Sequence, residues 1–208
     1  MKIIKPSVEF MTDINGEDVL KHIEQCGRVC YKSEDNITET SSHDFVRRII
    51  ESGHESVLEH YSFTVKFIVD RGVSHEIVRH RLASYSQEST RYCNYSKDKF
   101  NAEISVIEPC YLPRGSKAYD EWKYLCERAE VSYFWLLGWG LTPQEARAVL
   151  PNSLKTEIVM TANIREWRHF FNVRCSKKAH PQMREVAIPA LRKAKQLIPV
   201  CFDDIKED

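Results

Sequence analysis

Glycine is scarce in this chain, at 7 of 208 residues, about half the usual share. The sequence contains neither a G-x-G-x-x-G motif nor a G-x-x-x-x-G-K-[ST] motif. Both motifs use glycine to bring backbone N–H groups close to a phosphate, so a Rossmann dinucleotide site and a P-loop are disfavoured. If the protein binds a nucleotide, it must do so with side chains.

Net charge, long apolar runs and closely paired cysteines are lacking as well. Thirty Lys and Arg balance thirty Asp and Glu, so any bound anion must be held by a local cluster of cations. No apolar run reaches the roughly 18 residues of a membrane span, and we expect neither a signal peptide nor a membrane partner. The seven cysteines form no C-x-x-C pair, which predicts reduced, buried thiols in a cytoplasmic protein.

The length and the hydrophobic content of 42% predict a single domain, residues 1–208, with a substantial core. Apolar periodicity and turn residues predict strands and helices without a regular βα alternation. The predicted strands are 3–11, 61–70, 103–109 and 154–162, and the predicted helices are 17–30, 43–52, 74–82, 116–137, a short one from 143, 164–176 and one after Pro181. This order predicts an α+β (mixed α/β) fold, with a mostly antiparallel central sheet flanked by helices.

Local signals locate several element ends and faces. Residues 61–70 alternate between apolar and polar side chains, which predicts a half-buried strand. The sequence from Thr142 to Glu145 is a capping box with proline at the first helical position, and Asn163 can cap the helix that follows it. The spacing within 116–137 places Leu125 and Cys126 on the inward face of that helix.

The densest group of functional side chains is Arg79-His80-Arg81, followed by short hydrogen-bonding residues and then Arg91. On a helix, Arg79 and Arg81 would point roughly 200° apart, so the triplet either ends a helix in solvent or touches two different ligands. Hydroxyl, amide and guanidinium groups suit a phosphorylated, polyhydroxylated ligand. The spacing alone leaves both interpretations open.

A second cluster, from Gly53 to His60, holds two histidines and two glutamates and raises the possibility of a metal hydrolase. His54 and His60 are not four residues apart, so the cluster does not match the zinc-binding helix pattern. His75 and His80 are one residue too far apart for that pattern. We therefore expect no metal, and interpret these residues as polar groups on a loop and at the start of a strand.

The third cluster runs from Asn163 to Arg174. Trp167, Phe170 and Phe171 supply the buried stripe of a helix, and Arg174 lies almost two turns beyond Trp167 on or beside that face. Two interpretations stay open for Arg174. It is either a surface residue with a buried aliphatic stem, or a half-buried cation for an anionic or carbonyl ligand.

The triplet 79–81, followed after seven residues by Ser89, resembles the RHR-x7-S signature of the flavin-dependent thymidylate synthases. The stretch G-H-E-S before it, A-R-A-V-L-P over 146–151, and Asn163-x-Arg165 through Arg174 also resemble that family. The likeness spans nearly the whole chain, which is identified as a member of the family.

The resemblance implies that dUMP is converted to dTMP, with 5,10-methylenetetrahydrofolate as carbon donor, NADPH as reductant and non-covalently bound FAD as hydride relay. It also implies an α/β fold around an antiparallel sheet, and a homotetramer whose sites are each assembled from several subunits. By position, the implied FAD contacts are Ser56, Arg79, His80, Arg81, Gln87, Asn163, Arg165 and His169. The implied dUMP contacts are Glu76, Arg79, Gln87, Glu88, Ser89, Thr90, Arg91, Arg147 and Arg174, the last being the catalytic residue that activates the uracil.

These residue types suit the implied chemistry. A guanidinium stays charged and can stabilise negative charge on the uracil without exchanging protons. Cys93 and Cys175 only flank functional positions, so we expect no thiol nucleophile, and we expect Ser89 to bind phosphate or base rather than attack. The chain departs from the family at three positions: Ser86 stands where asparagine is common, Gln87 where glutamate is common, and Lys178 where some members have histidine.

A single-stranded nucleic-acid-binding protein is the alternative function. Arginines and tyrosines are interspersed along this region, as cations and aromatic rings are on surfaces that stack bases. They are Arg79, Arg81, Tyr85, Arg91, Tyr92 and Tyr95. The zero net charge and the lack of RNP and KH motifs count against this function, so we expect no nucleic-acid partner.

Overall fold

The structure, a computed structural model, describes residues 1–97 and 100–207. It separates into two compact units, each assembled from stretches that are far apart in the sequence. Unit 1 comprises residues 1–7, 67–79 and 86–158, and unit 2 comprises residues 8–66, 80–85 and 159 onward. The single domain that the sequence led us to expect stays a prediction.

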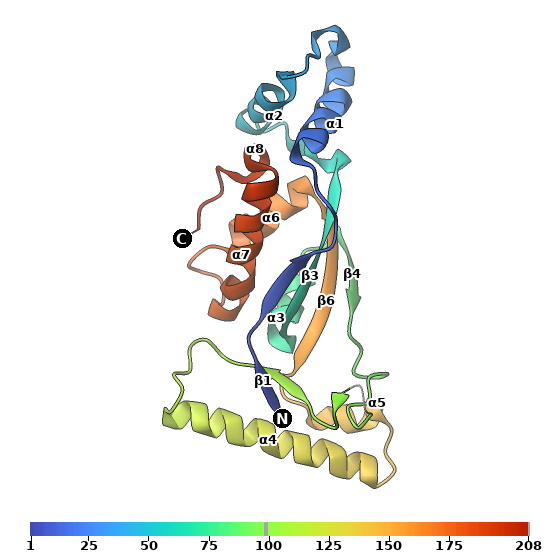
Figure 1. The fold of residues 1–208 in the computed structure, drawn as a ribbon, viewed down its shortest axis with the longest axis vertical. Coiled ribbons are helices and arrows are strands. Elements are labelled where there is room, and N and C mark those ends of the chain that lie inside the picture. The colour runs from blue at the N-terminus through green and yellow to red at the C-terminus, as the bar shows by residue number, and fades with distance from the viewer. Residues whose placement is uncertain (98–99, 208) are drawn as a thin grey trace. The chain divides into compact units, whose positions relative to one another are not determined.

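Unit 1 contains a small parallel sheet and a long helix (Figure 1). Strand β1 (Lys2–Ile4) pairs with β5 (Ser105–Ile107), and Ile3 lies opposite Val106. Its helices are α3 (Arg71–Ile77), α4 (Lys117–Gly138) and α5 (Pro143–Ala146), and the 3-10 turn η5 (Arg147–Val149) follows α5. Buried Ile104, Val106, Cys126, Tyr133 and Leu154 belong to one hydrophobic core cluster of this unit.

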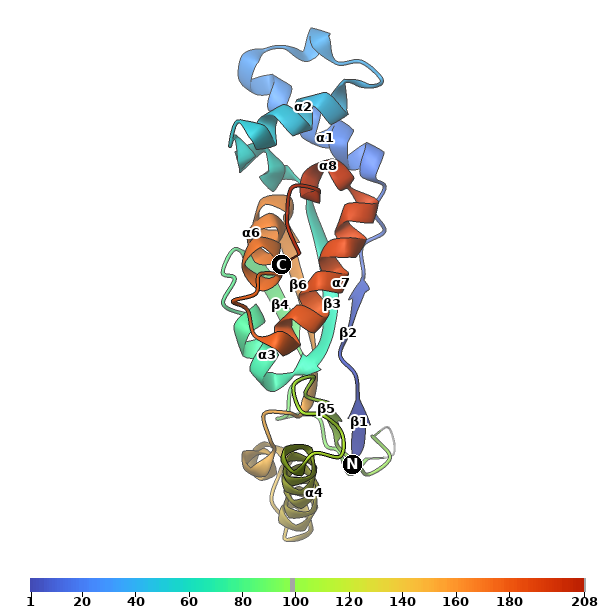
Figure 2. The ribbon, with the colours of Figure 1, turned by 90° about the vertical axis from the view of Figure 1, so that its left-hand side faces the viewer.

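Unit 2 is mostly helical, and Figure 2 shows α6 and α7 side by side. Its helices are α1 (Gly16–Arg28), α2 (Ser41–Glu51), α6 (Ile164–Arg174), α7 (Pro181–Leu197) and α8 (Pro199–Phe202), with 3-10 turns η1 (Val29–Tyr31), η2 (Glu34–Asn36) and η3 (Glu55–His60). Trp167 of α6 is fully buried and stacks on Phe63 and Phe171, with ring centroids 5.0 and 5.7 Å apart. Burying each such ring contributes about 2–3 kcal/mol, so this stack anchors α6 to the sheet.

The larger sheet has the strand order β2-β3-β6-β4, formed by β2 (Ser7–Phe10), β3 (Ser62–Asp70), β6 (Lys155–Asn163) and β4 (Ala83–Gln87). Strands β3 and β6 are antiparallel. The Ile164 N–H donates to the Tyr61 carbonyl, whereas three residues further along β3 the Thr64 hydroxyl lies 2.8 Å from that of Thr161. The predicted mixed fold, with an antiparallel sheet flanked by helices, is confirmed.

Several local predictions are confirmed. The apolar residues of 61–70 are buried, as the alternation predicts, at Phe63, Val65, Phe67 and Val69. The Asn163 side chain caps α6 by accepting a 2.9 Å hydrogen bond from the Glu166 N–H. The capping box from Thr142 to Glu145 is formed at the start of α5.

Other local predictions are wrong. Leu125 is 56% exposed, because the buried seam of α4 repeats every seven residues through Tyr119, Cys126 and Tyr133 and leaves Leu125 outside it. The predicted helix 74–82 instead starts at Arg71, because the Asp70 side chain accepts from the Val73 N–H, and it ends at Ile77.

The predictions for the N-terminal strand and the cysteines also need correction. Residues 3–11 form two strands rather than one, with Lys5 and Pro6 between them, and proline cannot donate to a strand ladder. Cys30 and Cys110 are exposed, so not every thiol is buried. Within the described residues, the structure contains no helix long and apolar enough to cross a membrane.

Candidate active site

The triplet 79–81 lies in the turn between α3 and β4, beyond the end of the helix. Arg79 and Arg81 are exposed, whereas His80 between them is only 5% exposed. The two arginines therefore differ from His80 in burial, and the divergence expected on a helix does not apply because the triplet lies beyond the end of α3. Arg79 belongs to unit 1, and His80 and Arg81 belong to unit 2.

Both ring nitrogens of His80 are engaged by side chains of α6. Nδ1 lies 3.0 Å from a carboxylate oxygen of Glu166, and Nε2 lies 3.1 Å from Nε of Arg174. The ring also packs edge-on against Phe170, with centroids 4.9 Å apart. Burial lowers the pKa of His80 below its usual value, and the smaller opposing effect of Glu166 does not reverse this. This shift favours the neutral form of the His80 ring.

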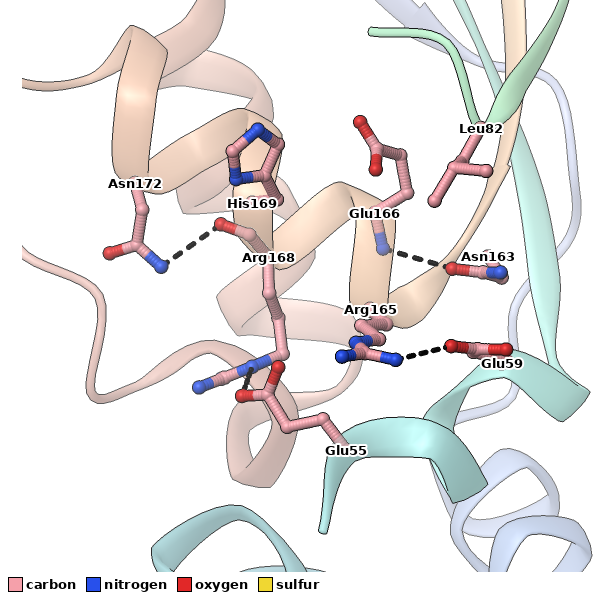
Figure 3. A pocket seen from close by; sticks show the side chains of 9 residues that line it. All are labelled: Glu55, Glu59, Leu82, Asn163, Arg165, Glu166, Arg168, His169 and Asn172. Carbon is pink, nitrogen blue, oxygen red and sulfur yellow. Dashed lines mark hydrogen bonds and ion pairs between the residues drawn. The ribbon is translucent and has the colours of Figure 1, made fainter. Parts of the chain in front are cut away.

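A cavity of about 740 Å³ opens beside this group in unit 2 (Figure 3). Most of its lining comes from α6 and from the residues just before it, with further residues from η3 and the turn before β4. The lining residues are Glu55, Glu59, Leu82, Asn163, Arg165, Glu166, Arg168, His169 and Asn172. This volume lies within the usual range for small-molecule sites, which is about 300–1,000 Å³.

Two arginines of α6 line the cavity but are held in different ways. The Arg165 side chain is 52% exposed and makes an ion pair with Glu59 at 2.6 Å. The Arg168 side chain is 6% exposed, and its Nε lies 3.1 Å from Glu55. Its two terminal nitrogens each lie 2.7 Å from an oxygen of Asp204. The Arg168 guanidinium is thus held in the protein interior by its partners, whereas Arg165 lies at the exposed rim of the cavity.

Six of the expected FAD contacts belong to unit 2, and three of these, Asn163, Arg165 and His169, line the cavity together. The other three are Ser56 and Arg81, which are exposed, and His80, whose ring is engaged as described. Arg79 and Gln87 lie in unit 1. The cavity residues fit a flavin dinucleotide, because a cation, an imidazole and an amide are suitable partners for pyrophosphate and ring carbonyl oxygens.

Eight of the expected dUMP contacts lie in unit 1, and Arg174 lies in unit 2. Nη1 of Arg147 donates to the Thr90 hydroxyl at 3.3 Å. The Ser89 hydroxyl accepts from the Arg91 N–H at 3.2 Å, within a turn that follows β4. The Arg147 guanidinium and the Thr90 hydroxyl therefore lie together, as a phosphate site requires.

Gln87 and Glu88 are tied to neighbouring strands. The Gln87 amide donates to the hydroxyls of Ser74 at 2.9 Å and Thr156 at 3.2 Å. One oxygen of Glu88 lies 2.9 Å from Nζ of Lys155, which compensates its charge. These contacts hold the end of β4 against β6. Glu76 and Arg79, the remaining members of this set, lie on α3 and just after it.

Sequence reasoning missed the partners of these residues. The sequence suggests only a metal-binding role for Glu55 and Glu59, whereas in the structure they form ion pairs with Arg168 and Arg165. Glu55 and Glu59 are four residues apart, and Arg165 and Arg168 are three apart, so each pair has the spacing of neighbours on one helix face. Nothing in the sequence indicates that these two segments, more than a hundred residues apart, face each other. The pattern Asn163-x-x-Glu166 indicates a capping box, but the Glu166 carboxylate turns to His80 instead.

His80, Glu166 and His169 are the one group of three potential ligands within metal-binding distance in the part of the chain that is described. The Arg174 guanidinium that donates to His80 opposes a cation at this point. His54 and His60 do not belong to this group.

The aromatic platform of the nucleic-acid alternative is not formed. Tyr95 is buried at 4% exposure, and the Tyr85 hydroxyl donates to the His80 carbonyl at 2.6 Å. Tyr92 alone of the three tyrosines is widely exposed. A succession of stacked bases therefore lacks the surface that it needs.

Comparisons with known proteins agree on one family. Residues 13–200 match the family described as thymidylate synthase complementing protein. A flavin-dependent thymidylate synthase of Geobacter sulfurreducens is 36% identical over 188 residues, covering 85% of this chain and 78% of that protein. One of Corynebacterium glutamicum is 33% identical over 217 residues, covering 96% and 84%.

A solved structure extends the likeness to the fold. The UMP/dUMP methylase PolB from Streptomyces cacaoi, bound with 5-Br dUMP, superposes with a TM-score of 0.78 at 25% identity. The match covers 98% of this chain and 96% of that one. With a family match across most of its length and relatives above 30% identity, this chain belongs to the flavin-dependent thymidylate synthase family.

Proposed function

We propose that this protein methylates dUMP to dTMP in the cytoplasm, taking the carbon from 5,10-methylenetetrahydrofolate and the electrons from NADPH, with FAD bound non-covalently, as a homotetramer. The observation that carries this proposal is the family match over residues 13–200, which includes both the signature and Arg174. When bound, the flavin supplies hydride transfer, which no side chain of this protein can perform.

Arg174 is the catalytic residue in this proposal. It ends α6 and is only partly exposed, next to the ring of His80. A permanently charged guanidinium stabilises the negative charge that develops on N3 and O2 of the uracil, and this raises the electron density at C5. Partial burial strengthens that interaction, because fewer water molecules screen it.

The segment after β4 binds the rest of dUMP. Arg91 and Arg147 offer their guanidinium groups to the phosphate, and the Ser89 and Thr90 hydroxyls offer hydrogen bonds. The observation that supports this assignment is the hydrogen bond from Arg147 to the Thr90 hydroxyl within unit 1. Gln87 and Glu88 hold this segment against the sheet through Thr156 and Lys155.

Unit 2 holds the cofactor in this proposal. Arg165 at the rim of the cavity pairs with the pyrophosphate, while Asn163 and His169 hydrogen-bond within the cavity, and Ser56 and Arg81 add contacts from the surface. The remaining expected FAD contacts are His80 in unit 2 and Arg79 and Gln87 in unit 1.

The buried thiols do not suit a nucleophilic role. Burial raises the pKa of Cys175 to about 12, and those of Cys126 and Cys201 to about 11 and about 12. Fewer than about one molecule in a thousand would carry a thiolate at these positions at pH 7. Burial of these thiols therefore favours charge stabilisation by Arg174 over attack by one of these cysteines.

One experiment tests the function. The purified protein is reconstituted with FAD, its visible spectrum is recorded, and dTMP is measured with dUMP, methylenetetrahydrofolate and NADPH, each also omitted in turn. Bound flavin bands and dTMP formation that needs every component are expected. Absence of flavin binding, or dTMP formation without added or bound flavin, would overturn the proposal. Light scattering of the same sample tests the tetramer.

A further inference from the structure

Three side chains form a continuous chain of hydrogen bonds in unit 2, from Glu166 through His80 to Arg174. We propose that Glu166 is a positioning residue, which acts through the His80 ring to fix the direction of the Arg174 guanidinium. This inference rests on the proposed role of Arg174 in binding and activating dUMP. It assigns His80 to the orientation of Arg174 rather than to direct contact with the cofactor.

The bond to Arg174 determines the tautomer of His80. A guanidinium has only N–H donors, so Nε2 of His80 must accept and must carry no proton. A neutral ring then carries its proton on Nδ1, which donates to the Glu166 carboxylate at 3.0 Å. The opposite tautomer would place an N–H of the ring against the N–H of Arg174 and leave the carboxylate without that donor.

Glu166 is well placed to enforce this tautomer. It is 7% exposed, and a buried carboxylate is costly unless donors face it, so the bond to His80 is strengthened by the low local polarity. Its position is set by the first turn of α6, where its N–H donates to Asn163.

His80 itself is held on two further sides. The Tyr85 hydroxyl donates to its backbone carbonyl at 2.6 Å, and its ring packs against Phe170. With the backbone and the ring plane fixed, the remaining freedom of His80 is which nitrogen carries the proton. Glu166 determines that choice.

Protonation of His80 has a predictable effect on the orientation of Arg174. The charged and titratable groups that face His80 are Glu166, His169 and Arg174 from α6, and Tyr85 from β4. A protonated ring has two donors and can no longer accept from Arg174, so the orientation of Arg174 is lost on the acid side. Removing the Glu166 anion removes an effect that raises the His80 pKa, so the acid limb of activity moves to lower pH.

Two substitutions and a matched control test the inference. Glu166→Leu removes the acceptor for Nδ1 of His80, and Glu166→Gln keeps an acceptor of the same shape without the charge. Glu24→Gln is the control, because Glu24 is also a buried carboxylate of unit 2 and pairs with Arg28 at 2.7 Å. FAD content, kcat and KM for dUMP, and the pH profile are measured on each folded, FAD-loaded protein.

We expect Glu166→Leu to keep FAD and to lose about 10- to 100-fold in kcat/KM for dUMP, the scale of a displaced positioning group. Glu166→Gln should lose less and should shift its acid limb to lower pH, while Glu24→Gln should match the wild type. If Glu166→Leu does not fold, the acid limb of Glu166→Gln decides alone. Wild-type kcat/KM in a folded Glu166→Leu, or an unshifted acid limb in Glu166→Gln, would overturn the inference.

A spectroscopic readout separates this inference from the function on which it rests. In protein labelled with ¹⁵N-histidine, the His80 ring should show the Nδ1-protonated tautomer in the wild type and lose that preference in Glu166→Leu. Because this readout needs no turnover, a wild type that makes no dTMP would refute the proposed function alone. A wild-type His80 with its proton on Nε2 would refute the positioning role alone.

Discussion

Arg165 and Arg168 lie three residues apart on α6 and line the same cavity, yet their contacts predict opposite consequences of removal. Arg165→Ala should weaken FAD binding and leave the fold intact, because its side chain is 52% exposed and its ion pair with Glu59 is at the surface. Arg168→Ala should destabilise the protein, because this buried guanidinium bridges Glu55 and Asp204.

The contacts set the size of each effect. Removing one partner of a buried ion pair costs about 3–5 kcal/mol. The side chains of Glu55 and Asp204 are 28% and 52% exposed and can regain water, which favours the lower end, about 3 kcal/mol. For a chain of this length that corresponds to a fall in Tm of about 6–12 °C. Losing one charge-assisted hydrogen bond from Arg165 to a phosphate weakens FAD binding by about 10- to 150-fold.

Two measurements on each variant check this pair. Thermal unfolding is followed by circular dichroism at one protein concentration without added FAD, and FAD affinity is measured by quenching of flavin fluorescence. The reasoning is refuted if Arg168→Ala melts at the wild-type temperature, or if Arg165→Ala lowers Tm as much as Arg168→Ala does. Wild-type FAD affinity in Arg165→Ala would remove Arg165 from the cofactor site.

Three further predictions follow from the site and from unit 1. Arg174→Ala should keep FAD and lower dTMP formation by about 100-fold or more at saturating dUMP, with Arg174→Lys recovering only part, because a point charge lacks the two-pronged geometry; steady-state assays check this. Cys93→Ala combined with Cys175→Ala should retain most of the turnover, and complete loss in a folded, FAD-bound double variant would restore a thiol mechanism. The hydrogen bond from Arg114 lowers the pKa of Glu108 from 4.5 to about 2, so the folded state binds fewer protons than the unfolded state. The ionised Glu108 therefore stabilises the fold above pH 4.5, and this contribution is lost as the pH falls toward 2. The urea midpoint of Glu108→Gln should therefore lie below that of the wild type at pH 7, and the gap should close near pH 2; a gap that is constant with pH would contradict this.

The sequence predicts the fold well where the determining contacts are local. Asn163 caps α6 through a residue three positions on, and the alternation around Val65 reports the buried face of β3 directly. Leu125 marks the limit of such reasoning. Helical spacing allows a wide apolar face, but the actual seam of α4 is narrow, and its width is decided by the residues packed against it.

The site is less predictable, because its contacts join distant segments. His80 and Glu166 are 86 residues apart, and Glu59 and Arg165 are 106 apart. Sequence alone identifies Arg165 and His80 as polar residues of interest, and the family resemblance supplies their expected ligands. It does not show that the ring of His80 is already occupied on both sides, nor that Arg168 faces inward while Arg165 faces the rim.

The bond between Arg174 and His80 also has an entropic consequence. A free arginine side chain carries about 2 kcal/mol of rotamer entropy, which a ligand must normally overcome when it immobilises the group. Here folding has already restricted Arg174, since its Nε is bonded to a buried ring. In the proposed complex, a uracil that binds this guanidinium therefore does not have to overcome most of that entropy loss. The saving of up to about 2 kcal/mol corresponds to up to about 30-fold in affinity. In its proposed role, Arg174 is thus already ordered before the uracil binds, and binding need not be preceded by a search among its rotamers.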